Sequence, residues 1–204
     1  MAHSNVLELE TCLDECLAYC ATHPKHEFVA FYHPRLQQAK ERWVETVEVS
    51  DYHYLAWQKE FREDRVAWRK LSTELKKTQD ALRRVNAVGY DESTVRHWDE
   101  ELLTDAVNEL LEYLRSRVDV LDIAQERIEA LERLLGAAKS EVSDADTALS
   151  AFKRHVMFRA DAMGAMIATI GDFRVAMRRE LGKKSDEYRS IRWPMSVAPD
   201  EPVL

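Results

Sequence analysis

Between Pro34 and Gly89 the chain contains neither glycine nor proline. Seam positions recur through this stretch in alternating steps of four and three, which is the spacing of a coiled coil or helical bundle. The seam consists of Trp43, Val47, Ser50, Tyr54, Trp57, Phe61, Asp64, Trp68, Leu71, Leu75, Thr78, Leu82 and Val85. Its first half is aromatic, which suits a core of several helices better than a two-stranded zipper. The sequence therefore predicts one long helix over residues 34–88.

Helix-breaking residues divide the rest of the chain. Pro24 ends a first helix, Gly89 is a natural C-terminal cap, and the tail after Pro194 has the composition of a disordered end. We therefore expect an N-terminal helix with a bridging segment in 1–33, a helical bundle in 34–193 and a disordered tail in 194–204. The expected helices of the bundle span about 34–88, 92–136 and 140–183.

The seam does not mark the predicted boundary at Gly136, because its steps of four and three continue without a break from Leu121 to Met177. Either one helix runs about 90 residues, or a turn falls near Gly136 and Ser140. Charge favours the turn: residues 65–84 carry a net +5, 91–126 a net −8 and 174–192 a net +4. With a turn, both basic segments lie beside the acidic one.

The predicted fold is thus all-α: an elongated, coiled-coil-like antiparallel bundle of three long heptad-bearing helices plus a short N-terminal helix. This prediction rests on seam spacing and on few glycines and prolines, five of each in 204 residues.

Composition also bears on function. The net charge of −8 gives no drive toward nucleic acid, and we expect no nucleic-acid partner. The sequence has no phosphate-binding glycine loop, no G-x-S-x-G and no Glu-x-x-His pair for a di-iron bundle. We therefore expect no enzymatic activity, no cofactor and no small-molecule substrate. The absence of a leader-like N-terminus or a long apolar run predicts a cytoplasmic protein.

A cluster of potential soft-metal ligands lies near the N-terminus: Cys12, Cys16, Cys20, His23 and His26. Cysteines four apart share a helical face, so two thiolates could bind one Cu(I) or Zn²⁺ ion. The favoured interpretation is packing, because two leucines continue the same face and cysteine is often buried as a small apolar residue.

A second segment combines small residues with methionines: Met163, Gly164, Met166, Ala168 and Gly171. Small residues allow helices to approach closely, and methionine fills irregular gaps. The segment predicts either a homodimer or partner-helix contact, or close packing against the aromatic seam within the chain.

Charged residues raise two further questions. Arg178, Arg179, Lys183 and Lys184 form a basic patch that could contact a membrane surface, although pairing with the acidic segment 91–126 is favoured. Asp64 lies on the seam, as does Arg159; a buried ion pair that fixes the register, a polar site in the core and a locally wet seam or outward-snorkelling side chain all remain open.

The favoured function is a non-enzymatic scaffold or adaptor that self-associates, as a homodimer, and binds protein partners through long helix faces. The alternative is a dimer of BAR-like size that binds curved or anionic membranes. A second alternative is Cu or Zn binding by the cysteine and histidine cluster.

Overall fold

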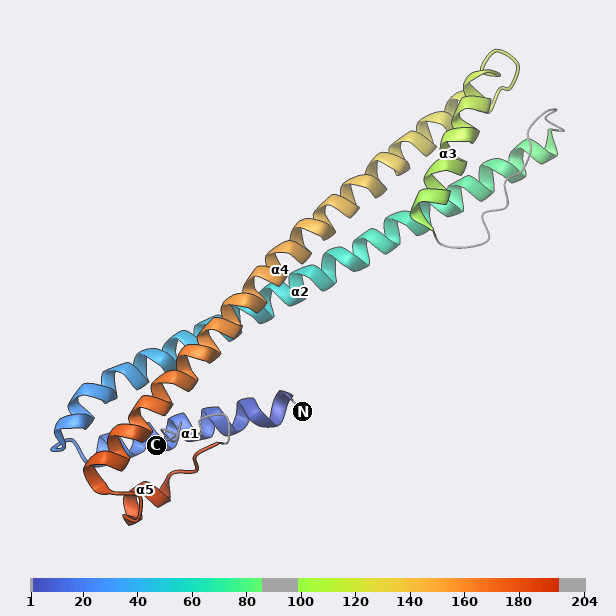
Figure 1. Ribbon diagram of the computed structural model, residues 1–204. Helices are drawn as coiled ribbons and strands as arrows, with labels where there is room; N and C mark the ends of the chain where they lie inside the picture. The colour runs from blue at the N-terminus through green and yellow to red at the C-terminus, as the bar shows by residue number, and fades with distance from the viewer. Residues whose placement is uncertain (1, 86–98, 195–204) are drawn as a thin grey trace, which may run out of the picture. The chain divides into compact units, whose positions relative to one another are not determined.

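The computed structural model describes residues 2–85 and 99–194, and these residues are all-α (Figure 1). The helices are α1 (Ala2–Thr22), α2 (Glu27–Arg84), α3 (Glu100–Arg115), α4 (Ala124–Leu181) and α5 (Asp186–Ser190). No strand occurs in the described ranges, which confirms the predicted fold class. The predicted tail in 195–204, and the predicted ends of helices in 86–98, lie outside the described residues.

The chain divides into two compact units, to which α2 and α4 both contribute. The terminal unit contains residues 1–52 and 153–204, and the central unit contains residues 53–152. In the terminal unit Tyr32 of α2 contacts Phe173 of α4, and Asp51 pairs with Arg159. In the central unit α2 and α4 likewise pack against each other in antiparallel directions, since Trp57 contacts Phe152 and Glu74 pairs with Arg127.

In the terminal unit α1 is the third helix, packed on α2 and α4. The Trp43 indole N–H donates to Glu10 of α1 at 2.6 Å, and the backbone N–H of Arg192 donates to Glu15 at 2.6 Å. Both ends of the described chain therefore join one core. Its buried side chains are Leu9, Cys12, Leu13, Cys16, Tyr19, Cys20, Val29, Leu36, Trp43, Ala162, Met166, Ile170, Phe173, Met177, Tyr188 and Ile191.

In the central unit the third helix is α3. Its first turn is capped by Asp99, whose carboxylate accepts hydrogen bonds from the backbone N–H groups of Glu101 and Leu102. One face of α3 is apolar and buried against α2 and α4. The core consists of Trp68, Leu71, Leu75, Leu82, Leu103, Ala106, Val107, Leu110, Leu111, Leu114, Ala124, Ile128, Leu131, Leu135 and Ala138.

The predicted turn near Gly136 is absent, because α4 is helical from Ala124 through Leu181. The seam positions on either side of the glycine, Leu135 and Ala138, are both buried in the central core. Gly136 itself is exposed, and its backbone stays helical because packing of the seam outweighs the roughly 1 kcal/mol that a helical glycine costs.

The chain reverses instead between α3 and α4, in residues 116–123. There the N–H of Arg117 donates to the carbonyl of Leu114, and the N–H of Leu121 donates to that of Arg117. The segment has no glycine or proline, so it carries none of the residues on which the boundaries were predicted. The bundle accordingly has two long helices and a shorter third one, where three long helices were expected.

The start of the second helix also differs from the prediction. α2 begins at Glu27, so Pro34 lies inside it and not in its first turn. The predicted boundary between residues 33 and 34 therefore falls within a helix.

The expected pairing of the basic segment 174–192 with residues 91–126 does not occur among the described residues. The segment belongs to the terminal unit, where Arg192 pairs with Glu15 and Arg179 pairs with Glu180. The pairing depended on the turn near Gly136, and without that turn the segment has different neighbours.

Two glycine substitutions test the continuity of α4. A Cβ added at Gly136 meets no heavy atom within 4 Å, so Gly136→Ala should raise the free energy of unfolding by about 0.5–1 kcal/mol. Gly182, which follows α4, has φ +88°, where alanine is strained, so Gly182→Ala should lower it. Urea unfolding followed by circular dichroism measures both; a loss of stability in Gly136→Ala would indicate a turn there.

Candidate interaction surface and buried polar groups

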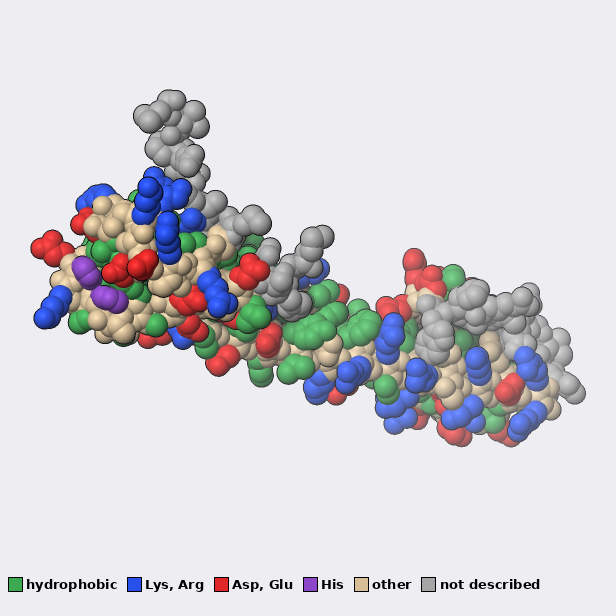
Figure 2. All heavy atoms as spheres, turned by 90° about the horizontal axis from the view of Figure 1, so that it is seen from below, with side chains coloured by type: hydrophobic (Ala, Val, Ile, Leu, Met, Phe, Trp, Pro, Cys, Tyr) green, Lys and Arg blue, Asp and Glu red, His purple; other side chains and the backbone are tan. Residues whose placement is uncertain are grey.

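The seam between α2 and α4 is incompletely buried in one part of the central unit. We use the name aromatic surface for the seam residues Tyr54, Trp57, Phe61 and Phe152 together with Leu55, which follows Tyr54 on α2 and lies off the seam. Leu55 is 64% exposed, Phe61 40% and Tyr54 39%, and the other two are half-buried. Figure 2 shows hydrophobic side chains that adjoin one another at the surface of the molecule, with Lys and Arg side chains beside them.

The rings of the aromatic surface form a connected series. Trp57 and Phe152 stack with their centroids 5.8 Å apart and their planes 4° from parallel. Phe152 also contacts Tyr54 at 5.4 Å, and Trp57 contacts Phe61 at 5.9 Å. The guanidinium of Arg65 lies 4.7 Å from the Phe61 centroid. These contacts order the rings without removing them from water.

The third helix accounts for the exposure. Phe61 and Trp68 occupy the same seam position one heptad apart, yet Phe61 is 40% exposed and Trp68 is 5% exposed. Trp68 lies against the first turn of α3, beside Glu100 and Leu103. Two helices enclose a large ring from one direction only, so rings that lack a third helix stay partly in water. The aromatic surface is therefore a part of the seam that no third helix covers among the residues the structure describes.

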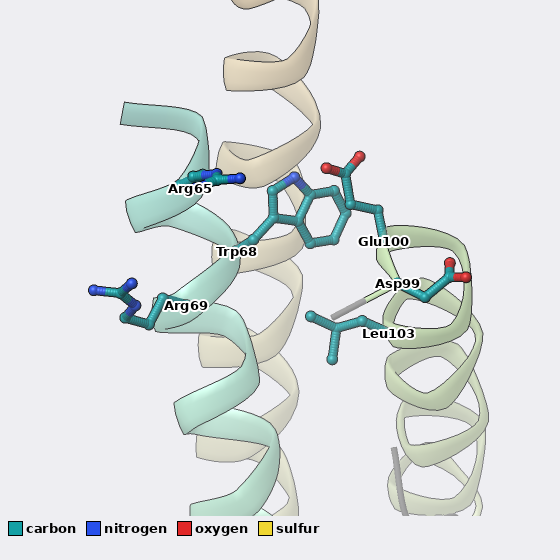
Figure 3. A pocket seen from close by; sticks show the side chains of 6 residues that line it. All are labelled: Arg65, Trp68, Arg69, Asp99, Glu100 and Leu103. Atoms are coloured by element: carbon teal, nitrogen blue, oxygen red, sulfur yellow. The ribbon is translucent and has the colours of Figure 1, made fainter. Parts of the chain in front are cut away.

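A pocket lies where α3 begins (Figure 3). Its volume is about 350 Å³. Arg65 and Arg69 line it from α2, and Asp99 and Glu100 line it from α3, with the Trp68 ring between the two helices (Figure 3). The opposite charges on its two walls favour docking of α3 at this position.

Asp64 is a buried carboxylate on the seam beside this pocket. It is 6% exposed, and its Oδ1 has no hydrogen-bond partner. Burial raises the pKa of Asp64, and the charge of Asp146 adds to the effect, while Trp68 and Arg65 act in the opposite direction. Burial together with Asp64, Asp146 and Asp99 raises the pKa of Glu100. Carboxylates from α2, α3 and α4 therefore repel one another at neutral pH.

Asp64 thus forms a buried polar site and does not pair with Arg159. Arg159 belongs to the terminal unit, where it lies 3.8 Å from Asp51 and 5.4 Å from the Trp43 ring centroid. Its side chain is 36% exposed, so its head reaches water as a snorkelling arginine does.

The raised pKa of Asp64 predicts a pH dependence of stability. The folded state binds the proton more tightly than the unfolded state, so the free energy of unfolding should fall as pH rises from the ordinary value of 3.8 through the raised pKa. Asp64→Asn should remove this contribution and stabilise the protein at pH 7 by about 1 kcal/mol. Urea unfolding of the wild type and of Asp64→Asn from pH 4 to pH 8 measures this pH dependence. The control is Asp144→Asn, which changes an exposed carboxylate. Equal stability of the two variants at pH 7 would contradict the prediction.

The three cysteines are buried in the core of the terminal unit, at 0–1% exposure. A hydrogen bond with Cys12, together with burial, raises the pKa of Cys16, and burial raises the pKa of Cys20 to about 11. His23 stacks on Tyr19, with centroids 4.3 Å apart. Among the described residues, no three side chains of the predicted cluster place ligand atoms within 4.8 Å of one another. The placement fits the packing interpretation.

These thiols should be unreactive in the folded protein. The raised pKa values of Cys16 and Cys20 leave little of their thiolate forms at neutral pH, and burial blocks access to all three thiols, so alkylation of Cys12, Cys16 and Cys20 should follow global unfolding. Mass spectrometry after iodoacetamide labelling, across a urea series, measures this. Modification of Cys16 or Cys20 in the absence of urea, with the circular dichroism signal intact, would contradict it.

The small-residue segment on α4 is split between core and surface. Met166 is fully buried, while Gly164 and Ala168 are exposed, and a Cβ added at Gly164 meets nothing within 4 Å. Met163 and Gly171 are half-buried. The exposure of Gly164 and Ala168 does not fit close packing of these two residues against the aromatic seam within the chain. Contact with a partner at these positions stays a prediction.

The predicted basic patch has neighbours of opposite sign. Arg178 is half-buried, and Arg179 pairs with Glu180. Lys183 and Lys184 are exposed and make no ion pair within the described part of the chain, but Asp186 and Glu187 follow directly. This placement dilutes the positive potential that membrane binding requires. Separately, no helix in the described ranges combines the length and apolarity needed to cross a bilayer.

Among the described residues, the carboxylate oxygens of an acidic group that was not predicted, Glu60, Glu63 and Glu141, lie within 4.8 Å of one another. Only the packing of α2 on α4 brings Glu141 to the other two, so sequence spacing held no signal for it. Lys59 lies 3.1 Å from both Glu60 and Glu63 and offsets their repulsion.

Comparison with known proteins identified no relative: no family model matches the chain, and no match was found among curated proteins or solved structures.

Proposed function

We propose that this chain is a non-enzymatic helical scaffold or adaptor that self-associates and binds protein partners, and that the aromatic surface is its binding site. The observation that carries the proposal is the difference in exposure between Phe61 and Trp68. The two residues occupy the same seam position one heptad apart, but α3 covers only Trp68 among the described residues. Aromatic side chains that remain accessible and mutually ordered are the usual anchors of protein interfaces.

Two features of the surface support a protein ligand rather than a small molecule. The rings lie along a pair of antiparallel helices as a connected series of partly exposed side chains. Leu55, with 64% exposure, adds an aliphatic side chain that intrachain packing does not require. An added helix would bury these side chains as α3 buries Trp68.

A photoreactive amino acid at position 55 tests the proposal in cells. We expect crosslinked adducts of higher mass, whose protein component mass spectrometry identifies, because a bound protein would lie against Leu55. The matched control places the same amino acid at Leu102, which is 54% exposed on α3 of the same unit and outside the aromatic surface. Adduct yields at position 55 no higher than at position 102 would refute the proposed binding site.

A further inference from the structure

We propose that the central unit binds an anionic lipid surface through basic residues on the outer side of α2. We call these residues the basic row; they are Arg69, Lys70, Lys76, Lys77, Arg83 and Arg84. The inference goes beyond the proposed function, because it assigns a different ligand to residues outside the aromatic surface.

The basic row consists of three doublets that recur every seven residues. Seven residues make two turns of a helix that packs along a seam, so each doublet lies about 10 Å beyond the previous one on the same side of α2. The six positive charges therefore follow one straight strip about 20 Å long and do not spiral around the helix.

The basic row lies on the side of α2 that is turned away from the seam. Each doublet directly follows a buried seam residue, namely Trp68, Leu75 or Leu82. Because successive helical residues point about 100° apart, the two residues after each buried one point outward. All six side chains are exposed, and Figure 2 shows Lys and Arg side chains that recur along the part of the surface formed by the central unit.

The acidic residues of the same stretch neutralise the row only in part. Residues 69–84 contain six basic and two acidic residues, which leaves a net charge of +4. Lys77 lies 3.5 Å from Glu74, which also pairs with Arg127 at 2.6 Å, and Arg83 lies 2.8 Å from Asp80. Exposed pairs of this kind are weak, so lipid phosphates can compete for both cations.

The other four members of the row meet less negative charge. Arg69 lines the pocket at the first turn of α3, where Asp99 and Glu100 form the opposite wall. Within residues 2–85 and 99–194, no ion pair is made by Lys70, Lys76 or Arg84.

The acidic helix α3 lies behind the row. Residues 99–112 contain six Asp or Glu and no Lys or Arg. However, α3 packs on the seam side of α2, and the axes of packed helices are about 8–10 Å apart. This separation is about one Debye length at physiological ionic strength, so a surface that touches the row is repelled by α3 less strongly than the row attracts it.

The shape and chemistry of the row favour a lipid surface over other anionic ligands. A plane can touch all three doublets at once, whereas a nucleic-acid duplex is a cylinder that meets a crossing helix over a short length. A protein helix would need apolar contacts, but Thr73 and Asp80, which lie between the doublets on this side, are polar. Clusters of about four to eight basic residues on a helix bind anionic lipid headgroups.

Vesicle sedimentation with the purified full chain tests the proposal. We expect the chain to sediment with phosphatidylcholine vesicles that contain about 30% phosphatidylserine, and to stay in solution with phosphatidylcholine alone. Binding should weaken as salt rises from about 50 to about 500 mM, because salt screens the attraction. A folded chain that stays in solution with the anionic vesicles at low salt would overturn the proposal.

Charge reversal of the central doublet tests the position of the site. Lys76→Glu/Lys77→Glu should weaken binding to the anionic vesicles about tenfold or more, and Lys76→Arg/Lys77→Arg should keep it, since both retain or reverse charge at the same place. Circular dichroism confirms that each variant is folded.

The matched control is Lys183→Glu/Lys184→Glu, which makes the same change at an exposed basic doublet of the terminal unit. It gives the chain the same net charge as the reversed central doublet, yet it should leave vesicle binding within about twofold of wild type. An equal loss in both glutamate variants would show that binding follows net charge and would overturn the assignment to the row.

Duplex DNA provides the remaining comparison. If the chain binds duplex DNA and loses it in Lys76→Glu/Lys77→Glu, but does not bind the anionic vesicles, the row binds nucleic acid and the lipid proposal is wrong. Crosslinks at position 55 report on the aromatic surface, so the proposed function is tested separately from this inference.

Discussion

The structure depends on the antiparallel packing of α2 against α4. Both helices contain 58 residues, and isolated helices gain little from propensity alone, so their stability comes from the seam they share. The seam explains why α4 continues through Gly136 and why Ser50 and Thr78, although polar, are buried. The seam also determines which residues of α2 lie opposite which residues of α4, as Glu74 lies opposite Arg127 in the central unit.

Two helices alone do not enclose a core of large side chains, so the position of a third helix determines which seam side chains are buried away from water. In the terminal unit α1 supplies it, with three buried cysteines as small packing residues. The raised pKa values of Cys16 and Cys20 keep these two thiols protonated at neutral pH. In the central unit α3 supplies it from Trp68 onward. Among the described residues the aromatic surface has no such helix, and the proposed function follows from that one difference in packing.

The sequence predicted the class of fold and most of the seam, because steps of four and three express the geometry of packed helices directly. It failed where the boundary lay in a segment without glycine or proline, between Arg115 and Ala124. It also failed at Gly136, where a residue that often ends helices lies within one. The pairing of charged segments that was predicted from that turn failed as well, since exposed ion pairs are too weak to dictate topology.

For the candidate sites the sequence by itself determined which residues were chemically notable, and the tertiary structure decided what each can do. Spacing placed Cys16, Phe61 and Asp64 on helical faces, but spacing is the same whether a face meets another helix or water. Contact with α2 and α4 makes Cys16 part of a core, whereas Phe61, which no third helix in residues 2–85 and 99–194 covers, stays exposed. Burial depends on contacts between segments distant in the chain, and a local periodic pattern carries no record of them.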